Sequence, residues 1–521
     1  MFENEYTWGK AVLHGTQDEF NKKFDNAVES IEKNFGRQYP CIINGKKIFS
    51  ENTFDVRSPS DTRLVLGTFP KLDESKTNEA ILSAKNAFAE WSSVSYQKRS
   101  EIFKQTADEF SKIKFELAAW MSFENGKTRI EAINDVDEAI DFMRFYSFQL
   151  EKNEGFCKHT PHPNPHEKTM TVLKPYGVWG IIAPFNFPSA IAIGMTTGAL
   201  LTGNTAVLKP ASATPLSSYF FADSIINKIP SGTLNFVTGD GGIVGKTLIE
   251  SSDVDGIAFT GSQSVGVTGF KKFTELASKP FIAEMGGKNP VIVTKNADLD
   301  KASEGVMRAA FGFGGQKCSA CSRVYVHKEV AQDFIKKLVE KSASLKIGMP
   351  WNGETFLGPV INPDAVSKFE NAVTLAKKDG KIIFGGSKIT DSEHANGYFV
   401  QPTIVTDLPK DHKLVTEELF LPFLCINTYE DFDEAIALAN KSEYGLTAGI
   451  FSEDKNQINK FFEKIQAGTV YANRESSATT AALVQSQPFV GWKSSGITGK
   501  GAGGEYYLQQ FLRSQTQTLC D

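Results

Sequence analysis

The residue best suited to chemistry in this chain is Cys318, which follows an apolar, glycine-rich run at 310–315. A cysteine acts as a nucleophile only as the thiolate, which needs nearby N–H groups or positive charge and room for a substrate. The glycines provide that room. Two alternatives compete: a buried structural cysteine, because free cysteines are often buried, and a redox or zinc pair with Cys321. The other four cysteines are scattered singly and a helical pattern precedes the pair, which disfavours the redox and zinc interpretations.

Three polar side chains follow predicted strands and could assist such a nucleophile. Asn186 lies between two aromatic residues and two prolines in the segment 184–188, where its amide could donate to an anionic oxygen. Lys209 places an ammonium group where a phosphate or ribose could lie. Glu284 ends a strand beside two glycines and is a candidate general base, although a structural role fits it equally well.

One glycine-containing loop suits a pyrophosphate. Residues 259–262 (Phe-Thr-Gly-Ser) follow a strand and open a helix, and backbone N–H groups at a helix start bind phosphates. Val267 stands where a P-loop has lysine, which argues against ATP chemistry. A G-x-G-x-x-G match at 499–504 has no strand before it, so we expect no dinucleotide fingerprint there.

The elements that must position these residues alternate between strands and helices. Near-continuous apolar strands separated by helices predict an α/β fold with two doubly wound parallel-sheet domains, which bind ligands at the carboxyl ends of their strands. The first set of strands is predicted at 176–183, 205–209, 233–237, 256–260 and 280–284, with helices at 189–201, 215–226, 242–250 and 265–277. The second set has strands at 290–294, 323–327 and 468–473, with helices at 300–311 and 329–345.

The two ends of the chain carry accessory elements. A helix is predicted within 3–35, a hairpin at 40–49 around Asn44-Gly45, and helices from 73 to 146. Glu138 lies among apolar residues on the last of these helices, where it is either solvated or functional. The tail at 506–520 alternates polar and apolar residues and predicts a strand for pairing with another subunit.

Composition excludes several classes of protein. The chain of 521 residues is 41% hydrophobic and 22% charged, which is ordinary for a globular protein of several domains. A net charge of −5 without dense Lys/Arg clusters argues against nucleic-acid partners. No apolar run reaches about 18 residues, so we expect no membrane partner. Six unpatterned cysteines and no visible targeting segment favour the cytoplasm.

Taken together, six motifs resemble the aldehyde dehydrogenase superfamily in order and spacing. They lie at 184–188, 207–210, 259–262, 284–288, 315–318 and 417–420. Within it the chain resembles most the 1-pyrroline-5-carboxylate dehydrogenases, which oxidise glutamate semialdehyde to glutamate in proline catabolism. The residues behind this closer resemblance lie at 36–40, 138–142, 315–323, 473–474, 487–489 and 503–511.

The resemblance implies roles for individual residues. Cys318 would attack the aldehyde, Asn186 and the Cys318 N–H would hold the oxyanion, and Glu284 would activate the water that hydrolyses the thioester. NAD would accept the hydride, and no metal is implied. The residues implied to contact the cofactor are Ala183, Pro184, Lys209, Ser212, Gly261, Ser262, Glu418 and Phe420. Those implied to contact the substrate are Glu138, Phe187, Ser319, Ala481, Ala482 and Phe489.

The chain departs from the family pattern at three points, one of which is Val490 in place of a glycine of the usual Pro-Phe-Gly-Gly run. The substrate-anchor loop usually reads Thr-Gly followed by a small residue, whereas here Ala481 replaces the glycine. This keeps other short acidic semialdehydes, such as succinate or 2-oxoglutarate semialdehyde, open as substrates, and a catalytically silent relative is a more distant alternative. Ser212 stands where many NAD-selective relatives have glutamate, so we expect NAD use with tolerance of NADP.

The resemblance also implies a domain plan and a homodimer or larger homo-oligomer. The expected parts are N-terminal helices with the start of the cofactor domain (1–155), a small β oligomerisation arm (156–174), a dinucleotide-binding domain (175–284), a catalytic domain (285–474), the substrate-anchor loop (475–496) and an oligomerisation tail (497–521).

Overall fold

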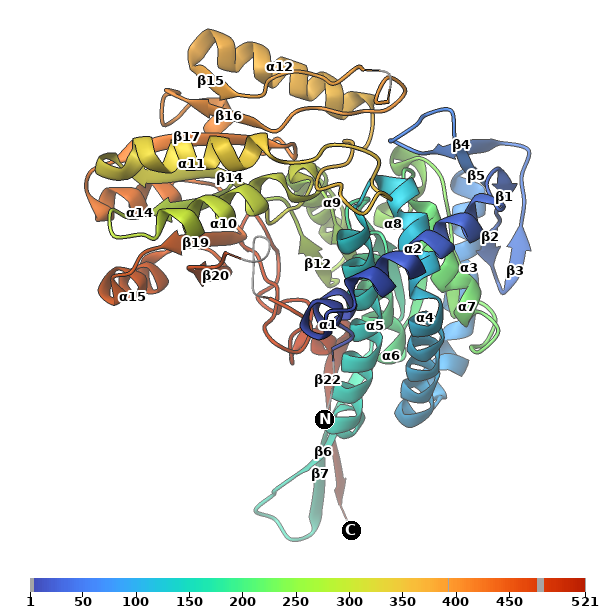
Figure 1. The fold of residues 1–521 in the computed structure, drawn as a ribbon. Helices are drawn as coiled ribbons and strands as arrows, with labels where there is room; N and C mark the ends of the chain where they lie inside the picture. Colours follow the sequence, from blue (N-terminus) through green and yellow to red (C-terminus); the bar gives the residue numbers. More distant parts are fainter. Residues whose placement is uncertain (1–3, 392, 476–481, 521) are drawn as a thin grey trace.

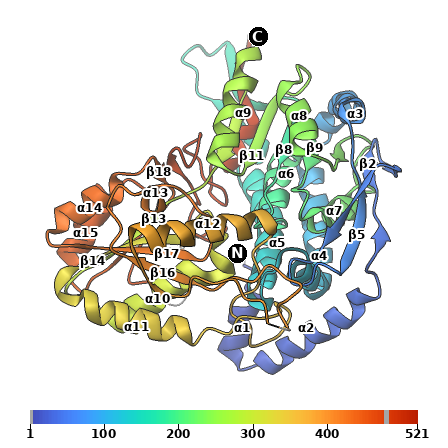
Figure 2. The ribbon, with the colours of Figure 1, turned by 90° about the horizontal axis from the view of Figure 1, so that it is seen from above.

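The chain folds into two α/β units that stand side by side, each built on a seven-stranded sheet (Figure 1). The structure is a computed structural model that describes residues 4–391, 393–475 and 482–520. Seen from above, the blue-to-green elements form one unit and most of the yellow-to-red elements the other, whereas the red C-terminal strand lies with the first unit (Figure 2). The predicted α/β architecture with two sheets is therefore confirmed.

The first sheet has the strand order β12-β11-β8-β9-β10-β2-β3. Its strands are β2 (Cys41–Ile43), β3 (Lys46–Ile48), β8 (Val178–Ile182), β9 (Thr205–Lys209), β10 (Leu234–Phe236), β11 (Gly256–Thr260) and β12 (Phe281–Glu284). The strands from β8 to β12 are parallel, and the predicted hairpin β2–β3 adds an antiparallel edge. Thr260 lies opposite Glu284, and Ile182 lies opposite Lys209. The carboxyl ends of these strands thus present their polar residues along one edge.

Helices cover both faces of this sheet. They are α3 (Glu74–Ser93), α4 (Tyr96–Asn125), α5 (Arg129–Lys152), α6 (Ala190–Leu201), α7 (Pro215–Ile225), α8 (Lys246–Glu250) and α9 (Gln263–Leu276). Almost every residue of α6 is buried, because this helix lies between β9 and α5. Its continuous apolar sequence is typical of a helix that contacts protein on all sides.

The second sheet has the order β15-β16-β17-β14-β13-β19-β20, and all its strands except β15 run parallel. The strands are β13 (Asn289–Val293), β14 (Cys321–His327), β15 (Lys381–Phe384), β16 (Thr403–Thr406), β17 (Phe423–Tyr429), β19 (Thr447–Phe451) and β20 (Thr469–Ala472). The helices are α10 (Leu299–Phe311), α11 (Ala331–Ala343), α12 (Pro363–Asp379), α13 (Lys413–Thr416), α14 (Phe432–Asn440) and α15 (Lys455–Lys464). Both sheets are thus mixed at one edge rather than wholly parallel.

Smaller elements complete the fold. Two helices, α1 (Thr7–His14) and α2 (Gln17–Glu32), occupy the region where one accessory helix was predicted, because Gly15 ends the first helix in a left-handed conformation. A three-stranded sheet contains β1 (Arg37–Gln38), β4 (Thr53–Arg57) and β5 (Val65–Pro70), and β18 (Tyr444–Gly445) pairs with β21 (Trp492–Lys493). Among the described residues, no helix is long and apolar enough to cross a membrane.

An arm of three strands projects from the first unit (Figure 1). It contains β6 (Cys157–Thr160), β7 (Glu167–Pro175) and β22 (Leu512–Cys520). Within the chain, β22 pairs along one edge with β7, from Leu512 opposite Pro175 to Cys520 opposite Glu167, and among the described strands its other edge stays open, so pairing with another subunit remains a prediction. The alternation of side chains predicts a strand but carries no information about which edge it joins.

Candidate active site

Cys318 lies in a short loop between α10 and β14. A 3₁₀ turn (Gly312–Gly315) precedes it, and residues 313–315 have φ angles of 50°, 61° and 65°. A Cβ atom on Gly315 would lie 2.2 Å from the Leu421 carbonyl oxygen, so this position requires glycine both for its φ angle and for space. The glycine-rich run therefore folds the chain tightly enough to leave the Cys318 side chain half-buried rather than covered.

The surroundings of Cys318 hold its thiol protonated. Burial raises the pKa of Cys318 to about 12, and the nearby carboxylates of Glu418 and Glu284 raise it further, whereas the N–H groups of Ser319 and Cys318 lower it. A thiolate is the reactive form. The two N–H groups are thus the local feature that favours the nucleophile.

Glu284 ends β12 and carries a carboxyl group suited to accepting a proton. Its Oε2 atom is buried and has no hydrogen-bond partner among the described residues. Burial raises the pKa of Glu284 to about 8, with partial compensation by a hydrogen bond from the Gly491 backbone. Glu284 and Glu138 both lie near Tyr146, whose pKa each of them raises. The structure thus brings the two carboxyl groups predicted from sequence into one region.

Asn186 lies in the turn between β8 and α6 and is 3% exposed. Residues of α4 and α5 hold this turn. Asn125 Nδ2 donates to the Phe185 carbonyl (3.2 Å), and Asp135 Oδ1 accepts from the Ala190 N–H (2.7 Å). These bonds fix both ends of the segment that carries the Asn186 amide.

A buried ion pair supports the aromatic neighbour of Asn186. Lys127 Nζ lies 2.7 Å from Asp135 Oδ2 and 3.5 Å from the centre of the Phe187 ring. Burial lowers the pKa of Lys127, and Asp135 opposes that shift. The sequence does not predict this pair, because the two residues are eight positions apart across a helix start and neither belongs to a recognised motif.

Glu138 and the two aromatic residues predicted to contact the substrate are all partly exposed. The Glu138 side chain is half-buried, and it forms no hydrogen bond or ion pair with any residue that the structure describes. Burial raises its pKa to about 7, and Asp135 adds to this while Lys127 opposes it. Phe187 and Phe489 are half-exposed and Ser319 is 7% exposed. Ala482 is half-buried, and Ala481 lies outside the described residues.

The residues predicted to bind a cofactor follow the strand ends of the first sheet. Lys209 is 5% exposed, donates to the Pro210 carbonyl (2.9 Å) and forms no ion pair with a described residue; burial lowers its pKa to about 8. The Ala183 N–H donates to the Lys209 carbonyl (3.0 Å), and the Gly261 N–H to the Glu284 carbonyl (3.2 Å). Pro184 is half-buried; Ser212 and Ser262 are exposed, the latter at the start of α9.

Glu418 and Phe420 complete this region from the second unit. Glu418 Oε1 accepts from the Gly287 N–H (2.8 Å), and a Cβ atom on Gly286 would lie 2.1 Å from Glu418 Oε2. The glycine pair after Glu284 therefore allows Glu418 to approach the backbone. Phe420 contacts Phe185 edge to face, with ring centres 5.8 Å apart. A buried ammonium group, two exposed hydroxyls and a backbone-bound carboxylate are groups of the kind that can bind the phosphates and riboses of a dinucleotide.

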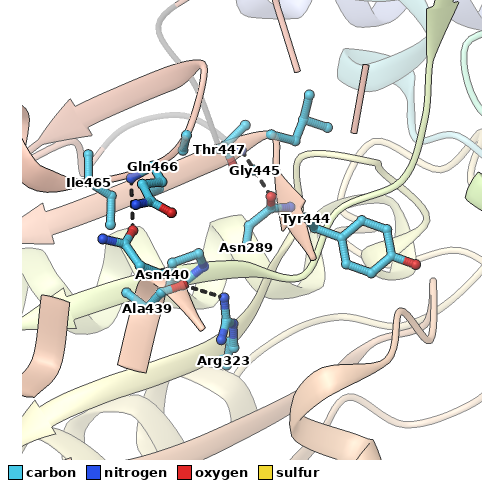
Figure 3. A pocket seen from close by; sticks show the side chains of 13 residues that line it. Asn289, Arg323, Ala439, Asn440, Tyr444, Gly445, Thr447, Ile465 and Gln466 are labelled. Carbon is cyan, nitrogen blue, oxygen red and sulfur yellow. Dashed lines mark hydrogen bonds between the residues drawn. The ribbon is translucent and has the colours of Figure 1, made fainter. Parts of the chain in front are cut away.

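A hollow at the ends of β13 and β19 is too small for a substrate. Its volume of about 10 Å³ is room for one water molecule. Asn289, Arg323 and Thr447 line it (Figure 3). No role is predicted for Asn289 from the sequence, because its bonds to Cys318 and Thr447 form only in the folded chain.

The comparisons with known proteins agree with this geometry. Residues 48–517 match the sequence model of the aldehyde dehydrogenase family. The 1-pyrroline-5-carboxylate dehydrogenase of Oceanobacillus iheyensis is 35% identical over 512 residues, which cover 96% of this chain and 97% of that protein. The protein of the same name from Geobacillus thermodenitrificans is 36% identical over 513 residues, 97% of each chain.

Solved structures give the same result. The 1-pyrroline-5-carboxylate dehydrogenase from Thermus with bound NAD superposes with a TM-score of 0.92 at 31% identity and covers 100% of this chain and 99% of that one. Proline utilization A from Bdellovibrio bacteriovorus gives a TM-score of 0.93 at 34% identity; the match covers all of this chain and 53% of that protein.

Proposed function

Because this chain belongs to the aldehyde dehydrogenase family, we propose that it oxidises L-glutamate γ-semialdehyde, formed from 1-pyrroline-5-carboxylate, to L-glutamate with NAD. Proline catabolism contains this reaction. The observation that carries the proposal for this substrate is Glu138, a half-buried carboxyl without a partner among the described residues. A substrate ammonium group would pair with it and restore its charge.

In the first half of the proposed reaction, Cys318 Sγ bonds to the aldehyde carbon as the carbonyl π bond opens and the thiol proton leaves to solvent. The carbonyl oxygen becomes negative, and the Asn186 amide and the Cys318 N–H donate to it. One such donor typically contributes about 3 kcal/mol in the transition state. When bound, NAD accepts the hydride that leaves the former aldehyde carbon, and a thioester on Cys318 remains.

In the second half, Glu284 removes a proton from water as the water oxygen bonds to the thioester carbon. The C–S bond then breaks, and the sulfur takes up the proton that Glu284 holds. The carboxylic acid ionises on release. A general base works best with a pKa near the working pH, which matches the raised pKa of Glu284, about 8.

The substrate assignment is tested by NADH formation with 1-pyrroline-5-carboxylate and with succinate semialdehyde, which lacks the ammonium group. We expect kcat/KM to be at least about tenfold higher for the first, or about 1.4 kcal/mol in transition-state binding. In Glu138→Gln the ratio of the two kcat/KM values should fall to about one. A preference for succinate semialdehyde in the unchanged enzyme would retain the family chemistry and assign another acidic semialdehyde.

NADP tolerance is a separate part of the proposal. Ser212 is exposed and its hydroxyl donates to the Gly239 carbonyl (3.1 Å), so the position offers no negative charge to repel a 2′-phosphate. We expect measurable turnover with NADP, and we expect Ser212→Glu to reduce it selectively through like-charge repulsion. A kcat/KM with NADP about 10³-fold or more below that with NAD would contradict the prediction for the unchanged enzyme.

We also propose a homodimer built on the arm, in the cytoplasm where six free thiols remain reduced. Residues 513–520 of β22 are exposed, and an edge strand of this kind invites pairing with a second chain. Removing residues 514–521 should therefore give single chains by light scattering. A cut after Gly504 would be less informative, because it also removes the buried Tyr507, Leu508 and Phe511. A monomeric full-length chain would refute the proposal.

A further inference from the structure

The carbonyl oxygens of all three residues at 318–320 are held by side chains from other strands. Asn289 Nδ2 donates to the Cys318 carbonyl (2.7 Å) and to the Ala320 carbonyl (2.9 Å). Thr447 Oγ1 donates to the Ser319 carbonyl (3.1 Å). The Thr447 N–H in turn donates to Asn289 Oδ1 (3.0 Å), a contact visible in Figure 3. Asn289 and Thr447 are 3% and 2% exposed, so water does not compete for these bonds.

This arrangement fixes the direction of the Ser319 N–H, which acts on the Cys318 thiol. The C=O and N–H of a trans peptide point in opposite directions. The Cys318 carbonyl points at Asn289, so the Ser319 N–H on the same peptide points away from Asn289 and hydrogen-bonds the Cys318 sulfur. We propose that Asn289, supported by Thr447, is a positioning residue that aims the Ser319 N–H at the nucleophile.

The charges around the sulfur show why this direction matters. Glu284 and Glu418 are the charged groups that act on Cys318 in the part of the chain that the structure describes, and both disfavour the thiolate. The N–H groups of Ser319 and Cys318 are the opposing influence. Losing the alignment of one of them leaves the thiol less acidic and less reactive.

The same strand segment also fixes the end of β12 that carries Glu284. The Gly445 N–H donates to Ser495 Oγ (3.0 Å), and Ser495 Oγ donates to the Gly286 carbonyl (2.7 Å). The Met285 N–H donates to the Ser495 carbonyl (2.8 Å). Residues 445–447 therefore contact both the nucleophile loop and the base-bearing strand.

The inference rests on the proposed function only in taking Cys318 as the nucleophile. Its test is alkylation of Cys318 by iodoacetamide at pH 8 without aldehyde or cofactor, followed by mass spectrometry of the Cys318 peptide. In Asn289→Asp, which keeps an acceptor for the Thr447 N–H but loses donors to two carbonyls, alkylation should slow by about tenfold, because the misdirected Ser319 N–H stabilises the thiolate less.

Asn235→Asp is the matched control. Asn235 is fully buried on β10, accepts from the Asn44 N–H (2.9 Å) and donates to the Gly232 carbonyl (2.8 Å). It repeats the bonding pattern of Asn289 in the first sheet, four strands from β12. A general loosening of the fold would slow or speed both variants, whereas the proposal requires the control to stay within about twofold of the unchanged protein.

If Asn289→Asp does not fold, two variants of Thr447 test the positioning role instead. Thr447→Val removes only the hydroxyl bond to the Ser319 carbonyl, and Thr447→Ser keeps it. We expect slower alkylation and a lower kcat with an unchanged KM for NAD in the valine variant, and rescue in the serine variant. If Asn289→Asp folds and is alkylated at the rate of the unchanged protein, the proposal is overturned. If that variant does not fold, an unchanged alkylation rate in Thr447→Val overturns it. The proposed function fails in a different way: the unchanged protein would then be alkylated normally at Cys318 but would oxidise no aldehyde.

Discussion

Replacing Cys318 with alanine is expected to abolish aldehyde oxidation. The proposed hydride donor is the tetrahedral adduct on the Cys318 sulfur, and without that sulfur the adduct does not form. Loss of a nucleophile of this kind lowers kcat by at least about 10⁴-fold. The measurement is NADH formation at saturating substrate and cofactor. Cofactor affinity, measured by fluorescence titration, should change little, because the predicted cofactor residues lie on other loops.

Cys321→Ala is the matched control for this prediction. Cys321 lies three residues further on, at the start of β14, is 3% exposed, and has a pKa that burial raises to about 12, as for Cys318. Burial thus raises the pKa of both thiols, and the two differ in access and in the groups around the sulfur. We expect Cys321→Ala to retain most of the activity. An active Cys318→Ala together with an inactive Cys321→Ala would show that the nucleophile was assigned to the wrong thiol.

The fold could be predicted from the sequence because its strands are short, apolar and separated by helices. The segment predicted as a strand at 205–209 is β9 without change, and the predicted helix at 300–311 is α10 with one residue added. Such patterns report local burial directly. They do not report which edge of a sheet a strand joins, and for this reason the pairing of β22 with β7 of the same chain could not be predicted.

Part of the candidate site could also be predicted from the sequence, for a different reason. Glu284 and Lys209 stood out because they end apolar strands, and the carboxyl ends of parallel strands gather at one edge. Asn289 and the Lys127–Asp135 pair did not, because their roles come from contacts with residues 29 or more positions away: Cys318 for Asn289 and Ala190 for Asp135. Contacts at this separation exist only in the folded chain, and no local spacing rule encodes them.

The last prediction concerns Glu284→Gln, which should separate the two halves of the reaction. Glutamine has the same shape but cannot accept a proton, so hydrolysis of the thioester should slow by about 10² to 10⁴-fold. Thioester formation does not need this base. A rapid burst of about one NADH per active site should therefore precede a slow steady state in the variant.

The pH dependence provides the check on this assignment. Glu284 has a pKa of about 8, so its carboxylate form, the base, increases as the pH rises toward that value. Where hydrolysis limits turnover, kcat of the unchanged enzyme should rise with pH and level off above about 8, and the rise should vanish in Glu284→Gln.

Glu124→Gln is the control. Burial also raises the pKa of Glu124 to about 8, but this carboxyl accepts hydrogen bonds from Leu216 and Ser217 at the start of α7. The Glu124→Gln substitution should lower thermal stability without changing the pH dependence of kcat. A Glu284→Gln enzyme that shows no burst and keeps the rise with pH would assign the base elsewhere.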